Sequence, residues 1–121
     1  MGDNKQKIEK VNLQYTATSF SELFKYLSVG KLNDHMLNIV QLENRTLDFH
    51  VHEQSDEMFY IIEGKMKIEF EDKIIDLEEG DFLIVPKGVV HRPMCKNLVK
   101  VLLIEKIGTL TKDNTGGTYG E

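Results

Sequence analysis

The stretch "FHVHEQSDEMFYIIEG", residues 49–64, places two histidines and a glutamate inside an otherwise apolar, strand-like run. Residues two apart in a strand project from the same face, so His50 and His52 point together while Val51 points the other way. Glu57 follows after the short connection "EQSD". If the strands on either side of that connection pair, Glu57 can face the same interior as the two histidines.

Period-two alternation along the rest of the chain predicts further strands. The clearest is "KMKIEFE", residues 65–71, in which apolar and charged side chains alternate. The other predicted strands are residues 35–42, 47–52, 57–64, 74–77, 82–86, 87–93 and 99–107. Many short strands joined by Gly, Asp and Asn turns predict an all-β barrel or sandwich.

One segment has a helical pattern, "SFSELFKYL" at residues 19–27. Ser19 and Glu22 have the spacing of a capping box, and Gly30 is a natural end for a helix. An apolar stripe at helical spacing consists of Phe20, Leu23, Phe24 and Leu27. We therefore expect a short N-terminal helix before residue 30, with a short strand at residues 11–17.

The length of 121 residues suits one domain. Residues 1–10 are polar and are expected to form a flexible N-terminal tail. Residues 11–107 should form the barrel domain, and residues 108–121, rich in Gly and Thr, a C-terminal tail.

Charge and composition exclude some classes of partner. The net charge is −5 without a basic block, which argues against nucleic acid. No stretch is long and apolar enough to span a bilayer, and residues 1–10 lack the apolar core of a signal peptide. Cys95 is the single cysteine, so no internal disulfide is possible. We expect a soluble, cytoplasmic protein that binds a small molecule and does not bind nucleic acid or membranes.

A third histidine, His91, lies far along the chain after the turn "PKG". Imidazole nitrogens and a carboxylate that converge on one point suit a divalent transition metal. An isolated His-x-His pair is more often surface polarity or local hydrogen bonding, so the spacing of the surrounding residues decides between these interpretations.

That spacing resembles the two signature motifs of the cupin family, "HVHEQSDEMFYIIEG" for the first and "GDFLIVPKGVVH" for the second. The resemblance is close over residues 44–95. It implies a double-stranded β-helix, the cupin jelly-roll barrel of two antiparallel sheets, with a divalent transition metal (Fe, Mn, Zn or Ni) near one mouth. It also implies four metal ligands: His50, His52, Glu57 and His91.

The sequence departs from the family pattern at two positions. Asn44 stands where the first motif usually opens with Gly, and Asn tolerates the same left-handed backbone. Cys95 stands where the second motif usually closes with Asn, which removes a local hydrogen bond but no ligand.

The reaction stays open, because one fold hosts many chemistries. A metal-dependent enzyme acting on a small polar molecule is one hypothesis, either a dioxygenase or oxidase using iron, or a sugar or sugar-phosphate isomerase or epimerase. Residues 56–93 look like small cupins described as mannose-6-phosphate isomerase-like. The alternative is a non-catalytic ligand-binding or sensor module. An acid–base residue in the pocket would favour an enzyme, whereas an apolar pocket with a metal would favour binding or oxygen chemistry.

No catalytic residue is assigned from the sequence, although Tyr60 and Arg92 are polar enough to contact a substrate. Residues 57–62 are apolar on both faces, which is unusual for a small barrel with one solvent-facing side per sheet. We therefore expect a second copy of the chain to cover the outer face, giving a homodimer.

Overall fold

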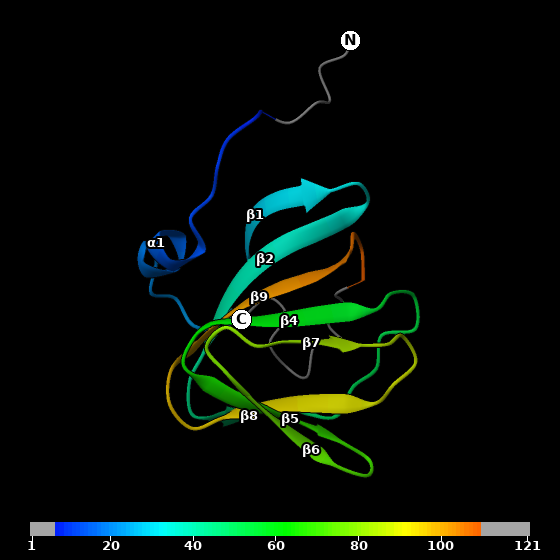
Figure 1. The fold of residues 1–121 in the computed structure, drawn as a ribbon. Coiled ribbons are helices and arrows are strands. Elements are labelled where there is room, and N and C mark those ends of the chain that lie inside the picture. Colours follow the sequence, from blue (N-terminus) through cyan, green and yellow to red (C-terminus); the bar gives the residue numbers. More distant parts are fainter. Residues whose placement is uncertain (1–6, 110–121) are drawn as a thin grey trace.

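The structure is a computed structural model, and it describes residues 7–109, with one short helix and nine strands (Figure 1). The elements in chain order are α1 (Leu13–Thr18), β1 (Leu27–Leu32), β2 (His35–Leu42), β3 (Arg45–Thr46), β4 (Glu57–Glu63), β5 (Lys65–Phe70), β6 (Ile74–Glu78), β7 (Phe82–Val85), β8 (His91–Cys95) and β9 (Val99–Lys106). The expected tails, residues 1–10 and 108–121, lie mostly outside the described residues.

Two antiparallel sheets form the body of the protein (Figure 1). The larger has the order β1-β2-β9-β4-β7, and the smaller has the order β3-β8-β5-β6. Every strand pair is antiparallel. The predicted all-β cupin barrel with one short N-terminal helix is confirmed.

The inner faces of the two sheets form the main hydrophobic core. On β4 and β5 the side chains that alternate inward include Phe59, Ile61, Met66 and Ile68, and each is at most 3% exposed. Phe70 and Val89 pack against this core while only partly buried. Burial of alternate side chains is the reason that these strands keep their register.

A second, smaller cluster lies on the outer face of the larger sheet. Ala17 of α1 packs against Ile39, Ile62 and Leu102, which come from three neighbouring strands. The helix therefore covers part of the face that the sequence left without a partner. This packing accounts for part of the apolar surface on the outer face of β4.

The predicted position of the helix is wrong. The helix is α1, which overlaps the segment expected as a strand, and Asn12 caps it by accepting a hydrogen bond of 2.8 Å from Tyr15 N. Residues 20–26 are irregular, and the strand β1 follows them. The reason is tertiary, because Gln41 of β2 donates through Nε2 to the carbonyls of Ala17 and Phe20.

Two predicted strands near the histidines also differ. Residues 47–52 are irregular except for one isolated bridge between His50 and His91. The strand expected at 87–93 begins only at His91, after a turn in which Gly88 has φ +82°. The remaining predicted strands correspond to β2, β4, β5, β6, β7 and β9.

Gly64, between β4 and β5, offers a test of this packing. Its φ is +95°, and a Cβ there would lie 2.5 Å from the backbone oxygen of Leu98. Gly64→Ala should therefore lower the free energy of unfolding by about 2 kcal/mol, measured by urea denaturation. Gly80→Ala is the matched control, because Gly80 has φ +89° with nothing near its added Cβ. Equal losses in the two variants would contradict the steric explanation.

Candidate metal centre

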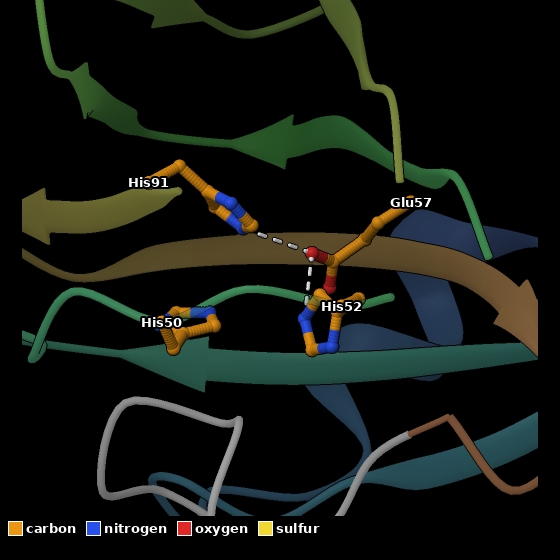
Figure 2. A group of neighbouring side chains, drawn as sticks. All are labelled: His50, His52, Glu57 and His91. Atoms are coloured by element: carbon orange, nitrogen blue, oxygen red, sulfur yellow. Dashed lines mark hydrogen bonds and ion pairs between the residues drawn. The ribbon is translucent and has the colours of Figure 1, made fainter. Parts of the chain in front are cut away.

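Four side chains from three parts of the fold meet at one end of the barrel interior (Figure 2). Glu57 is the first residue of β4 and His91 the first residue of β8. His50 and His52 lie on the irregular segment between β3 and β4. One ligand atom from each of the four lies within 4.8 Å of the others. The structure thus brings together all four residues that the family resemblance singled out.

The backbone fixes His50 beside His91. Each of these residues donates its backbone N–H to the other's carbonyl at 3.0 Å, and Leu47 N–H donates to the carbonyl of Pro93 in the same strand, also at 3.0 Å. Their rings are 4.6 Å apart between centroids. The strand β8 and the irregular segment are therefore held in register at the point where the His50 and His91 rings meet.

The two rings are also oriented in the same way. His50 Nδ1 lies 2.8 Å from the carbonyl of Asp48, and His91 Nδ1 lies 2.9 Å from the carbonyl of Val89. A ring that donates from Nδ1 to a backbone carbonyl presents its Nε2 lone pair on the opposite side, as metal-bound histidines commonly do. Both Nε2 atoms are therefore prepared to act as ligands.

His52 and Glu57 provide the test of whether a metal fits. The buried ring of His52 has no hydrogen-bond partner for either nitrogen among the described residues, although its Nε2 lies 3.2 Å from Glu57 Oε1. His91 Nε2 is also 3.2 Å from this oxygen (Figure 2). A neutral imidazole has one N–H, which His91 uses at Val89. In the form that donates from Nδ1 to Val89 alone, the Nε2 lone pair would face the Glu57 oxygen, and a cation between them would satisfy both.

Two of the four residues have shifted pKa values that suit metal binding. Burial alone would raise the pKa of Glu57, but His52 and His91 beside it outweigh burial and lower the pKa to about 2. Burial lowers the pKa of His50 below 6.5. Glu57 is therefore anionic and His50 neutral at pH 7, which are the forms that bind a cation.

A fifth ionisable residue, Glu105 of β9, was not found from the sequence. It is 1% exposed, and neither carboxylate oxygen has a hydrogen-bond partner among the described residues. Burial, followed by the nearby charge of Glu57, raises the pKa of Glu105 to about 8. Strand alternation in the sequence could have identified Glu105 as an inward-facing residue, because Val101, Leu103 and Glu105 occupy one face of β9.

A small cavity of about 20 Å³ adjoins the four-residue cluster. Its lining is apolar apart from His50, His52, Glu57 and Tyr26. This volume holds about one water-sized molecule. A larger open hollow of about 920 Å³ is lined by residues of β5 and β6 and by residues 96–98. None of the four cluster residues lines it.

Four further residues of the ionisable or polar types do not belong to the cluster. Tyr60 packs in the outer cluster with α1, and Arg92 pairs with Glu69. His35 contacts Asp34 at the surface. Cys95 is half-buried, and burial raises the pKa of its thiol, which disfavours the nucleophilic thiolate.

Comparison with known proteins agrees with the fold. The family model described as "Cupin domain" matches residues 39–104, which is more than half of the chain. The chain belongs to the cupin domain family.

Three relatives are informative. The uncharacterized protein YdbB of Bacillus subtilis is 37% identical over 82 residues, covering 67% of this chain and 72% of that protein. Quercetin 2,3-dioxygenase of Bacillus subtilis is 35% identical over 74 residues, covering 58% of this chain and 22% of the enzyme. The crystal structure of a cupin-2 domain containing protein from Shewanella frigidimarina is 31% identical, with a TM-score of 0.75, and covers 79% of this chain and 93% of that one.

Within residues 7–109, no helix is long and apolar enough to cross a membrane.

Glu105 predicts how the stability of the metal-free protein depends on pH. Its folded pKa of about 8 lies above the usual 4.5, so its contribution to stability is complete below pH 4.5 and is lost as pH rises through 8. Glu105→Gln should remove this loss, so that the stability of the variant relative to the wild type rises between pH 5 and about 8.5. Urea denaturation of chelator-treated protein across this range measures the difference. Parallel stability profiles would show that Glu105 does not titrate in this way.

Proposed function

We propose that the protein is a metal-dependent enzyme of the dioxygenase type, acting on a small organic molecule. The observation that carries this proposal is a buried cluster of three imidazoles and one carboxylate beside an apolar cavity. One divalent transition metal, with Fe, Mn, Ni and Zn as candidates, would be held by His50, His52, Glu57 and His91.

The donor set supports a metal with an open position. Three nitrogen ligands and one oxygen ligand suit iron, manganese or nickel, which take more than four ligands and so leave room for a reactant. Bound there, such a metal would supply the redox chemistry that joins dioxygen to an organic molecule. The protein's own contribution is to orient the His50 and His91 rings through backbone carbonyls, to place the negative charge of Glu57, and to exclude water with apolar walls.

The lining of the cavity favours oxygen chemistry over sugar-phosphate isomerisation. A phosphate is usually bound by Arg or Lys side chains, and none occurs among the described residues that line the cavity. The similarity to quercetin 2,3-dioxygenase supports the same choice for the matched part of this chain. Glu105 is ionisable and buried, and it does not line the cavity.

A non-catalytic ligand-binding or sensor role is the second candidate. The observation that favours this role is the small size of the cavity. Its volume is about 20 Å³, whereas sites for organic molecules are usually about 300–1,000 Å³. An organic substrate would therefore bind at the mouth of the barrel or require the barrel to open. Oxygen uptake by metal-loaded protein, with quercetin as the first probe, separates the candidates. Full metal occupancy without oxygen uptake across a panel of small organic molecules would favour the sensor.

Replacing His52 tests the metal site directly. His52→Ala removes a buried ring that would be a ligand, so metal affinity should fall at least about tenfold while the apolar core keeps the barrel folded. Elemental analysis of protein purified without chelators or metal-affinity resin, together with chelator competition, measures the change. His35→Ala is the matched control, because His35 lies at the surface beside Asp34. Unchanged affinity in His52→Ala would refute the site.

We also propose that the protein is a homodimer. The helix α1 covers only part of the outer face of the larger sheet, and Phe82 and Ile84 of its edge strand β7 remain 60% and 51% exposed. A second copy would bury these side chains. A cytoplasmic location is proposed as well, since the single cysteine, Cys95, is free.

Sedimentation velocity at micromolar concentration tests this assembly. The wild type should sediment as a dimer, and Ile84→Lys should sediment as a monomer because a charge would enter the apolar contact. Ile74→Lys is the control, because Ile74 is equally exposed, at 51%, but lies on the smaller sheet. A monomeric wild type would rule out the proposal.

A further inference from the structure

A row of three side chains lies on the outer surface of the smaller sheet, next to the row that carries the histidines. Because His50 and His91 form an antiparallel bridge, Phe49 stands opposite Arg92. Arg92 in turn stands opposite Glu69 in the pairing of β8 with β5. The next row on the inner side is His50, His91 and Phe70.

The three outer side chains contact one another in sequence. The guanidinium carbon of Arg92 lies 4.2 Å from the centre of the Phe49 ring. The Nε and Nη2 atoms of Arg92 both lie 2.9 Å from Glu69 Oε1, and Nε donates a hydrogen bond to that oxygen. Arg92 therefore joins β5 on one side to the irregular segment 47–56 on the other. We call Phe49, Arg92 and Glu69 the outer clasp.

The irregular segment needs such a contact more than a regular strand would. Within residues 47–56 the backbone bonds to other parts of the chain include the bridge at His50, a bond from Leu47 N–H to the carbonyl of Pro93 and a bond from Gly88 N–H to the carbonyl of His52, and Phe49 lies between the first two. Phe49 immediately precedes His50, and its ring is 45% exposed, so solvent exclusion alone does little to hold it. Stacking under the Arg92 guanidinium gives this ring a fixed partner.

We infer that Arg92 is a positioning residue for the metal centre. It acts through Phe49 to hold the His50 backbone against His91, and it touches neither the metal nor a substrate. This inference rests on the proposed metal site. The planar guanidinium stacks and forms two contacts with one carboxylate at the same time, which a lysine ammonium cannot reproduce. The proposed role thus depends on the planar shape of the arginine side chain as well as on its charge.

Metal affinity of Arg92 variants tests the inference. Arg92→Ala should weaken the binding of Ni²⁺ or Co²⁺ about tenfold in chelator competition, the effect typical of removing a group that supports a metal ligand. Arg92→Lys, which keeps the charge, should also weaken binding. The visible spectrum of the Co²⁺-loaded Arg92→Ala protein should shift toward that of the His50→Ala protein, because both changes disturb the same ligand.

A double-mutant cycle separates positioning from general stability. If Arg92 acts through His50, Arg92→Ala should produce no further loss of affinity in the His50→Ala protein. Arg45→Ala is the matched control, because the Arg45 guanidinium lies 4.4 Å from the centre of the Phe24 ring, and neither residue adjoins a cluster residue in sequence. It should leave metal affinity unchanged.

The possible failures are distinguishable. A wild-type protein that binds no divalent metal would overturn the proposed metal site, and the inference with it. A wild type that binds metal, with Arg92→Ala equal to it in affinity or with additive losses in the cycle, would overturn the role of Arg92 alone. Weakened binding in Arg45→Ala by the same factor would also overturn it, because the effect would then be nonspecific.

Discussion

The burial of the Glu57 carboxylate is the constraint on which the site depends. Glu57 is 3% exposed, and an isolated carboxylate in such a place would be costly. His52 and His91 reduce that cost, since each places a ring nitrogen 3.2 Å from Glu57 Oε1. These two contacts outweigh the effect of burial and lower the pKa of the carboxyl to about 2. The fold therefore has to bring the irregular segment 47–56 and the strand β8 next to Glu57 at the start of β4.

The fold meets this constraint through backbone geometry. Glu57 begins β4 in the larger sheet, and His91 begins β8 in the smaller sheet, so the site lies where the two sheets face each other. The reciprocal hydrogen bonds between His50 and His91 then attach the irregular segment to β8. The core of the barrel supplies stability, and the cluster lies against it, since the His91 ring contacts Phe59 of the core and Phe70 beside it.

The cupin fold by itself decides little about chemistry, because a fold is a scaffold on which different sites are built. The particular features of this chain are the donor set of the cluster, a small apolar cavity and an unpaired buried carboxyl at Glu105. Together they describe a cluster of metal-ligand side chains that borders a small apolar cavity, with a second buried carboxyl group nearby. The described residues that line the cavity include no Arg or Lys side chain.

The sequence by itself determined the parts of this protein that follow from local periodicity. Alternation predicted β5 nearly to the residue, because burial of one face of that strand enforces a two-residue repeat, whereas β2 and β4, which bury side chains on both faces, were recognised from their apolar runs. Motif spacing singled out His50, His52, Glu57 and His91, and the structure brings them together. Glu105 could also have been found, since it continues the inward face of β9.

Only the tertiary structure decided the segments whose partners are distant in sequence. The helical pattern of residues 19–27 was overridden because Gln41 binds the carbonyls of Ala17 and Phe20 and β1 pairs with β2. Among the described residues, the segment carrying His50 and His52 bonds to the backbone of β8 through Leu47 and His50, and the rest of the segment is irregular. The position of Tyr26 at the cavity likewise depends on how the chain crosses the barrel after α1. Local propensity is weak compared with such long-range hydrogen bonds and packing, so a pattern read along the chain cannot anticipate them.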